Sequence, residues 1–168
     1  MRPYLRVQNV YEARIDISDV KEMNFSPEEF ATFALRPGDI LLNEGQSREL
    51  VGRPALYRGE VPGACFQNTL VRYRHFDFVL AEFGLIVFRS YLRSGRFQQI
   101  SKQTTNIAHL SAGRFAALEF PLPPLAEQSR IVAQVDKLQA LTASLKARLT
   151  TAQTKQAHLA EALIAEVV

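Results

Sequence analysis

The sequence predicts an α+β protein, in which a mixed, aromatic-rich domain is followed by one long C-terminal coiled-coil helix. Three observations predict this architecture. First, all 8 glycines, all 8 prolines, all 11 phenylalanines and all 5 tyrosines lie before position 125. Second, residues 126–168 contain ten alanines, and large apolar residues recur there three and four positions apart. Third, the first 120 residues combine short apolar runs, helix signals and polar loops, as α+β domains do.

The shift in composition divides the 168 residues into three parts. We expect a globular domain over residues 1–120, a rigid Pro-Leu-Pro-Pro hinge at 121–124 and a single helix over 125–168. The whole chain has a net charge of +3, whereas residues 36–120 carry 11 basic and 7 acidic groups. This basic excess within the first domain permits a polyanionic partner without requiring one.

Composition also excludes several classes of protein. Hydrophobic residues make up 47% and charged residues 22% of the chain, which excludes general disorder. The single cysteine, Cys65, excludes an internal disulfide framework and a Cys-rich zinc module. No apolar run reaches the roughly 18 residues of a membrane span, and the N-terminus lacks the apolar region of a signal peptide. We therefore expect a cytoplasmic protein that has no membrane partner.

The first elements are predicted by capping and turn residues. Ser26, followed by Pro27 and by Glu29 three residues on, is typical of a helix N-terminus with a capping box. That helix should end before the Pro-Gly pair at 37–38. Residues 39–42 are then expected to form a short buried strand, and the glycines and polar residues at 43–52 indicate a loop.

The remaining elements of the first domain are predicted by their periodicity. Residues 55–57 and 67–74 are expected to be strands, the second because its apolar residues alternate. Helical spacing predicts a helix over 77–94, which Ser-Gly at 94–95 should terminate. Residues 101–106 form a polar loop, and we expect 117–122 to be a final strand.

The C-terminal helix has the pattern of a coiled coil. From position 131 to 163, ten positions that alternate steps of four and three form a seam, in which Thr142, Ala152 and Gln156 are the only residues that are not large and apolar. If all 43 residues from Ala126 are helical, the helix is about 64 Å long. One domain cannot cover such a length, so we expect the helix to pair with a second copy of the chain or with a partner subunit. The alternative is a helix folded back across its own domain. The expected contact residues are Ile131, Val135, Leu138, Leu145, Leu149, Leu159 and Leu163.

Motifs for catalysis are missing from the sequence. No phosphate-binding P-loop and no Gly-x-Gly-x-x-Gly dinucleotide fingerprint occurs. The three histidines, His75, His109 and His158, are far apart and form no metal-ligand pair. Nothing near Cys65 would lower the pKa of its thiol, so it is expected to be a small buried residue. We predict no catalytic residues, no metal and no cofactor.

Two polar loops of the first domain carry the residue types that contact DNA. Arg and Lys can bind phosphates or guanine, Asn and Gln can pair with adenine, and Ser and Thr can bind phosphate oxygens. Such loops are also common as solvated turns, and this alternative stays open at this point. The candidate DNA-binding residues are Asn43, Gln46, Ser47, Arg48 and Arg53 in the first loop, and Arg96, Lys102, Thr104, Thr105 and Asn106 around the second.

Four segments together resemble a known family. They are Gly38-Asp-Ile-Leu-Leu-Asn-Glu-Gly45, Phe66-Gln-Asn-Thr-Leu70, Thr104-Thr-Asn-Ile-Ala-His-Leu-Ser111 and Phe120-Pro-Leu-Pro-Pro-Leu-Ala-Glu-Gln-Ser-Arg-Ile-Val132. The last, which runs straight into the long helix, is the most specific. The chain resembles the specificity subunit of type I restriction–modification enzymes over nearly its whole length.

The resemblance implies a function in DNA recognition. In that family each target recognition domain reads one half of a bipartite duplex DNA target, and two long helices form an antiparallel pair that fixes the spacing. The subunit recruits methyltransferase (modification) subunits and an endonuclease subunit, and itself carries no catalysis. These partners and this non-catalytic role are what the resemblance implies for the present chain.

The sequence departs from the family pattern because it has one recognition domain and one long helix instead of two of each. It also begins where family members have further upstream sequence, so we expect a natural half-subunit, a truncated product or a designed fragment. Such a half should homodimerise through its helix and recognise a two-fold symmetric, interrupted target. The alternative function is a non-catalytic coiled-coil scaffold whose globular head binds protein and not DNA.

Overall fold

The fold is described here from a computed structural model that covers residues 1–103 and 107–167, without the side chains at 103, 159–160 and 162–167. Contacts divide the chain into two units, Met1–Ser129 and Arg130–Val168. The two units are described separately below. Both α-helices and β-strands are present, together with a long C-terminal helix, which confirms the predicted α+β class.

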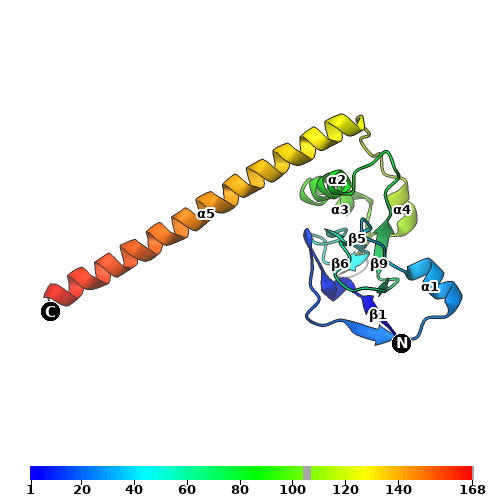
Figure 1. Cartoon of the computed structure of the whole chain (residues 1–168), viewed down its shortest axis with the longest axis horizontal. Coiled ribbons are helices and arrows are strands. Elements are labelled where there is room, and N and C mark those ends of the chain that lie inside the picture. The colour runs from blue at the N-terminus through cyan, green and yellow to red at the C-terminus, as the bar shows by residue number, and fades with distance from the viewer. Residues whose placement is uncertain (104–106, 168) are drawn as a thin grey trace. The chain divides into compact units, whose positions relative to one another are not determined.

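The elements of the first unit are short (Figure 1). The strands are β1 (Arg2–Leu5), β2 (Val10–Tyr11), β3 (Arg14–Ile15), β4 (Lys21–Met23), β5 (Ile40–Asn43), β6 (Gly45–Gln46), β7 (Pro54–Leu56), β8 (Cys65–Phe66), β9 (Leu70–Tyr73), β10 (Lys102–Gln103) and β11 (Ala108–His109). The helices are the 3₁₀ turn η1 (Val7–Asn9), α1 (Pro27–Phe33), α2 (Ala81–Arg93), α3 (Arg96–Ile100), α4 (Ala112–Ala116) and α5 (Leu125–Val167), which continues into the second unit.

The strands form small sheets around β5. In the central sheet β5 lies between β7 and β9 and runs antiparallel to both, with Leu41 opposite Ala55 and Arg72. All four β5 residues are buried, as expected of a strand that is covered on both faces. Three further sheets, with the orders β4–β1–β8, β10–β11–β6 and β2–β3, complete the described strands. The strand predicted at 39–42 is therefore confirmed as β5.

Helix α1 begins at the predicted cap. The Ser26 hydroxyl accepts a hydrogen bond from the Glu29 amide at 3.2 Å, and the Glu29 carboxylate accepts one from the Ser26 amide at 2.8 Å. This reciprocal capping box satisfies two N–H groups that the first turn would otherwise leave unpaired. The helix ends at Phe33, before the Pro-Gly pair that was expected to stop it.

Helix α2 covers the central sheet, and Figure 1 shows it together with α3 on one side of the strands. It begins at Ala81 and ends at Arg93, so the helix predicted over 77–94 is confirmed with a later start. Gly84 faces the sheet: a Cβ atom there would lie 3.1 Å from the side chain of Ile40. A glycine in this helix is therefore explained by the close approach of α2 to β5.

Aromatic rings fill the space between α2, α3, α4 and β9. Phe88 is at the centre, with ring centroids 5.0 Å from Tyr73, 5.1 Å from Phe115 and 5.7 Å from Phe120. Most of these contacts are edge-on or tilted, which is the arrangement that aromatic quadrupoles favour. Many of the aromatic residues before position 125 thus pack into this cluster, while Tyr4, Phe25, Phe33 and Phe66 form a second group.

The strand predicted at 117–122 is wrong. Helix α4 ends at Ala116, and the chain then runs without regular structure to the start of α5. Phe120 packs against Phe83 and Phe88 of α2, and the Glu119 carbonyl accepts a hydrogen bond from the Tyr91 hydroxyl at 2.6 Å. Phe120 is half-buried against α2, whereas Leu122 is exposed, and the prolines at 121 and 123 have no N–H to donate to a sheet.

The first turn of α5 is anchored within the first unit by Gln128. Its side chain is fully buried. The amide nitrogen donates to the carbonyls of Phe78 and Pro123, and the amide oxygen accepts from the backbone N–H of Leu80, each at 2.9 Å. The first turn of α5 is therefore fixed to the segments at 78–80 and 123 by three hydrogen bonds of one side chain.

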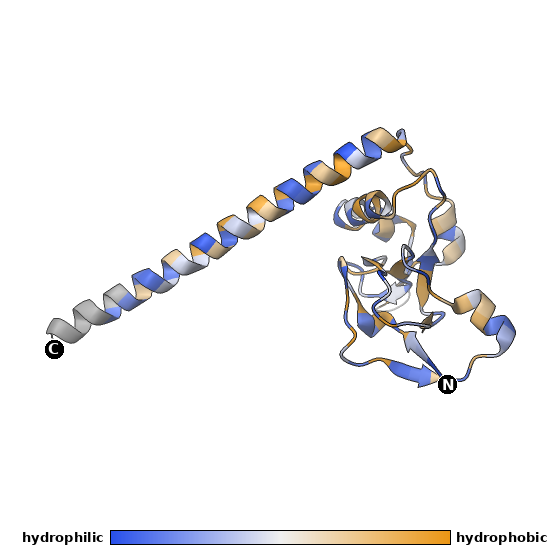
Figure 2. Ribbon diagram, in the orientation of Figure 1, coloured by the Kyte–Doolittle hydropathy of each residue, from blue (hydrophilic) through white to orange (hydrophobic). Residues whose placement is uncertain are grey.

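The second unit consists of the rest of α5, so the predicted long helix is confirmed. Bands of apolar and polar residues alternate along it (Figure 2). Leu138, Leu141, Leu145 and Leu149 are 52–59% exposed, which leaves an apolar stripe uncovered over several turns. Among the described residues, no helix is both long and apolar enough to cross a membrane.

Candidate nucleic-acid interface

A small sheet brings the two predicted polar loops together. In β6, Gly45 and Gln46 pair with His109 and Ala108 of β11, which also pairs with Lys102 and Gln103 of β10. Gly45 and Gln46 belong to the first predicted loop, and Lys102 and Gln103 belong to the second. Segments more than fifty positions apart in the sequence are therefore held on one three-stranded sheet.

The first loop is a tight turn that presents Arg48 to solvent. The amides of Leu50 and Val51 both donate hydrogen bonds to the carbonyl of Ser47 at 3.0 Å. The Gly52 amide donates a hydrogen bond to the carbonyl of Asn43 at 2.9 Å. Arg48 is exposed at the turn, whereas Gln46 and Ser47 are half-buried. This geometry leaves one cation and two polar side chains available at the same edge of the fold.

Gly52 fixes where this loop ends. Its φ of +75° lies in the left-handed region, which favours glycine. A Cβ atom at this position would be 2.5 Å from the ring of Phe97, a fully buried residue of α3. The loop therefore closes directly against the aromatic cluster, and the cluster holds it in place.

Asn43 and Arg53 lie beneath the loop. Asn43 is 0% exposed, its amide nitrogen is 3.4 Å from the Val10 carbonyl, and its Oδ1 has no partner among the described residues. The Arg53 guanidinium lies 4.8 Å above the Tyr11 ring, and burial lowers its pKa. Both were candidates for DNA contact, but the structure places Asn43 inside, where it does not present its amide at the surface.

The candidate residues around the second loop do not all lie together in the structure. Lys102 is exposed on β10, and His109, which was not a candidate, is exposed beside it on β11. Arg96 is not gathered with them: its guanidinium lies 3.2 Å from the Glu119 carboxylate and 4.8 Å from the centre of the Tyr91 ring. Thr104, Thr105 and Asn106 lie outside the described residues.

We call the group formed by Gln46, Ser47, Arg48, Lys102 and His109 the β6–β11–β10 surface. Its two basic side chains and its amide, hydroxyl and imidazole groups can contact phosphates and base edges. Nothing in the sequence marked His109 for it, because a strand of two residues has no periodicity to detect. Within the described residues, no three His, Cys, Asp or Glu side chains are placed to hold a metal ion.

The comparison with protein families decides the identity of this fold. Residues 3–153 match the model of the type I restriction modification DNA specificity domain. The chain belongs to this family. It is a type I specificity sequence with one recognition domain, as the junction motif at 120–132 suggested.

Relatives of known identity are specificity subunits. The specificity subunit of the EcoKI type I restriction enzyme of Escherichia coli K12 is 25% identical over 98% of this chain, which covers 36% of that protein. A Methanocaldococcus jannaschii sequence, assigned as the specificity subunit of the MjaX enzyme, is 27% identical over 77% of this chain and is covered to 31%. The present chain thus spans about a third of the length of these relatives.

The fold is also that of a solved specificity subunit. The crystal structure of the HsdS subunit from Thermoanaerobacter tengcongensis superposes with a TM-score of 0.69 and 21% sequence identity. The match covers 92% of this chain and 39% of that one. The specificity-domain fold therefore includes both the small sheets of the first unit and the helix that follows them.

Proposed function

We propose that this specificity domain recognises one half of a bipartite duplex DNA target through the β6–β11–β10 surface. The observation that carries the proposal is the sheet that joins two polar loops from distant parts of a chain belonging to a DNA specificity family. Arg48 and Lys102 can bind phosphates or guanine, and Gln46 can pair with adenine. The domain itself performs no catalysis and acts in the cytoplasm.

The proposed assembly is a homodimer formed by α5. The exposed Leu138, Leu145 and Leu149 need a second apolar surface, and a second copy of α5 offers a matching one. In the antiparallel arrangement that the family resemblance implies, Leu145 and Leu149 lie in the seam between the two helices. Two identical recognition domains would then read a two-fold symmetric, interrupted target and recruit modification and endonuclease subunits.

Salt dependence tests the DNA interface. Binding to a pool of random-sequence duplexes should weaken steeply as salt rises. The reason is that the protein displaces cations from the DNA phosphates when it binds, and this release is less favourable at high salt. The variants R48A and K102A should each weaken binding and lower the slope of log K against log salt by about 1 if they contact one phosphate. R58A, which removes an exposed arginine outside this surface, is the matched control.

The outcome separates two classes of function. Unchanged duplex binding in both variants would refute the assigned surface. A dimer that binds no duplex at any salt concentration would favour the scaffold alternative. Methylation mapping of DNA incubated with this chain, modification subunits and methyl donor would then identify the target. We expect R48A either to change the sequence that is methylated or to abolish methylation.

The dimer is tested by paired double variants of α5. L145D/L149D places two carboxylates in the seam and should convert the dimer to a monomer in sedimentation experiments. A140D/A147D adds the same charge at exposed positions outside the seam and should leave the dimer intact. A wild-type chain that is monomeric at micromolar concentration would overturn the proposed dimer.

A further inference from the structure

Four arginines gather around the β2–β3 hairpin, and none of them belongs to the β6–β11–β10 surface. Two lie on or beside the hairpin, and two lie on the C-terminal part of α2. Two carboxylates contact three of these arginines, at distances of 2.7–3.6 Å. Positive charge is therefore in excess. We call this group the hairpin–α2 cluster, and it consists of Arg14, Arg53, Arg89, Arg93, Glu12, Asp16 and Tyr11.

The turn of the hairpin is held against the rest of the domain. Ala13 has a φ of +59°, in the left-handed region that favours glycine. An alanine stays in this conformation only where the surrounding contacts enforce it. Its amide donates a hydrogen bond to the Pro54 carbonyl at 2.9 Å, and the Asn43 side chain lies 3.4 Å from the Val10 carbonyl. The hairpin is therefore bound to the start of β7 and to the base of the first loop.

The Tyr11 ring orders two of the arginines. The guanidinium carbons of Arg14 and Arg53 lie 4.9 Å and 4.8 Å from the centre of this ring. The ring is 40% exposed, and the Arg14 side chain is 64% exposed. A guanidinium that lies over an aromatic face is held by the contact, while its in-plane N–H groups stay available to bind a phosphate. The hairpin thus presents two ordered cations beside one ring.

Arg53 has the environment of a cation that gains from an external anion. Its side chain is half-buried, and its Nε has no hydrogen-bond partner among the described residues. Burial lowers the pKa of the guanidinium, although the nearby Glu12 carboxylate opposes this effect. A partly desolvated charge without a hydrogen-bonded partner is costly for a protein. An anion that a binding partner supplies would therefore interact with Arg53 strongly.

Glu12 connects the hairpin to α2. Its carboxylate accepts hydrogen bonds from Arg89 Nε at 3.2 Å and from Arg93 Nε and Nη2 at 3.2 Å and 2.7 Å. One carboxylate cannot neutralise two guanidinium groups. The Arg93 side chain is 72% exposed, and among the described residues its remaining N–H groups have no partner. Arg93 can therefore bind a further anion while it keeps its contact with Glu12.

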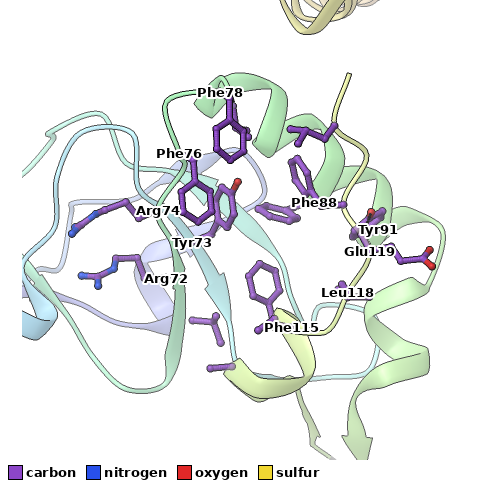
Figure 3. A pocket seen from close by; sticks show the side chains of 16 residues that line it. Arg72, Tyr73, Arg74, Phe76, Phe78, Phe88, Tyr91, Phe115, Leu118 and Glu119 are labelled. Carbon is purple, nitrogen blue, oxygen red and sulfur yellow. Dashed lines mark hydrogen bonds between the residues drawn. The ribbon is translucent and has the colours of Figure 1, made fainter. Parts of the chain in front are cut away.

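Two other arginines of the first unit are engaged by groups inside the domain. Arg72 and Arg74 stand at one end of an apolar groove of about 630 Å³, and their side chains point away from its aromatic rings (Figure 3). The buried Asp39 binds Arg74 through two contacts of 2.7 Å. Arg72 donates to two backbone carbonyls at the end of α1. These two guanidinium groups stabilise the fold, whereas Arg14 and Arg53 stabilise no such internal site.

We propose that the hairpin–α2 cluster binds the sugar–phosphate backbone of the duplex whose bases the β6–β11–β10 surface reads. The inference rests on the proposed function. Arg53 and Arg48 lie at the end and at the turn of the same loop, five positions apart, so their Cα atoms are separated by at most about 18 Å. The major groove of DNA is about 12 Å wide, so one duplex can contact both. Backbone contacts add affinity and orientation, but they carry no sequence information.

Removal of either ordered arginine should weaken duplex binding. R14A and R53A are each expected to lower the affinity for random-sequence duplexes about tenfold at low salt, and to lower the salt slope by about 1. R53K keeps the charge but loses the guanidinium fork, so it should also weaken binding. R58A is the matched control. Near-UV circular dichroism shows whether each variant stays folded, and R14A, which is mostly exposed, tests the cluster even if R53A does not fold.

Replacement of Glu12 should have the opposite effect. E12Q removes a negative charge beside the arginines, so we expect duplex affinity to rise about threefold in the folded variant. A cluster that only stabilises the fold predicts no increase. E22Q, at an exposed position of β4, is the control and should bind as the wild-type chain does. Unchanged or weaker binding by folded E12Q would overturn the proposal.

Methylation mapping distinguishes backbone contacts from base contacts. With modification subunits and methyl donor, R14A should methylate the same sequence as the wild-type chain, but to a lower extent. A change in the methylated sequence would show that Arg14 reads bases and would overturn the assigned role.

The two proposals fail in different ways. If the wild-type chain binds no duplex, DNA recognition and the backbone contacts are both wrong. If R48A and K102A weaken binding while R14A and R53A bind as R58A does, DNA recognition stands and the assignment of the hairpin–α2 cluster falls.

Discussion

Replacement of Gln128 by alanine should destabilise the first unit more than any exposed substitution on the same helix. The change removes three hydrogen bonds of 2.9 Å and leaves the Leu80 N–H and the carbonyls of Phe78 and Pro123 without their partner. At a net contribution of about 1 kcal/mol for each hydrogen bond, the loss is about 3 kcal/mol. If water enters the vacated space and replaces some of the hydrogen bonds, the loss of stability is smaller. If the space stays empty, the cavity adds to the loss.

Urea unfolding followed by near-UV circular dichroism measures this loss. All Tyr and Phe residues lie before position 125, so the signal reports the first unit and not the long helix. With an m value of about 2 kcal/mol per molar urea, the unfolding midpoint of Q128A should fall by about 1.5 M. Q139A, at an exposed position of α5, is the control and should change stability by no more than about 0.5 kcal/mol.

The isosteric variant Q128E separates hydrogen bonding from volume. A glutamate has the same shape, but its carboxylate would face two carbonyl oxygens, so burial and repulsion should raise the pKa of the new group. A folded-state pKa above the unfolded value near 4.3 means that stability falls as pH rises through that interval. Q128E should therefore be less stable at pH 7 than at pH 4. A Q128A midpoint equal to that of Q139A, together with a pH-independent Q128E, would refute the reasoning.

Two further outcomes follow from the described contacts. G52A should cost more than about 2 kcal/mol, because it combines a positive φ with a 2.5 Å clash against Phe97, whereas G113A in α4 meets no atom within 4 Å and should stabilise by about 0.5 kcal/mol. Equal melting temperatures would contradict this. Burial raises the pKa of Glu12, but hydrogen bonds from Arg93 and a second arginine of α2 outweigh it and hold the pKa low. The stability lost in E12Q should therefore be largest above about pH 5 and vanish as acid protonates the wild-type carboxyl; a difference independent of pH would contradict the prediction.

Local signals in the sequence predicted the elements that local chemistry determines. The α1 capping box, the buried strand β5 and the long helix α5 were all found where capping residues, an apolar run or a heptad repeat indicated them. In each case the responsible residues lie within a few positions of one another. The family resemblance rested on the same kind of contiguous motif.

The candidate site was harder to predict because it is built by long-range pairing. Nothing near Gln46 indicates that it pairs with Ala108, and strands of two residues carry no alternation. Asn43 was expected at the surface because it is polar, yet it continues a buried strand and lies beneath the loop. The segment at 117–122 has the composition of a strand, but tertiary packing against α2 decides its conformation.

The two-residue strands β6, β10 and β11 have a consequence for local opening. Few hydrogen bonds hold them, whereas β5 is paired on both sides and fully buried. Separation of these short strands requires far less free energy than global unfolding, so their amide protons should exchange with solvent well before those of β5. The edge that we assign to DNA can therefore adjust its pairing while the centre of the domain stays closed. Duplex binding should then appear as slowed exchange at β6 and β11, with no change at β5.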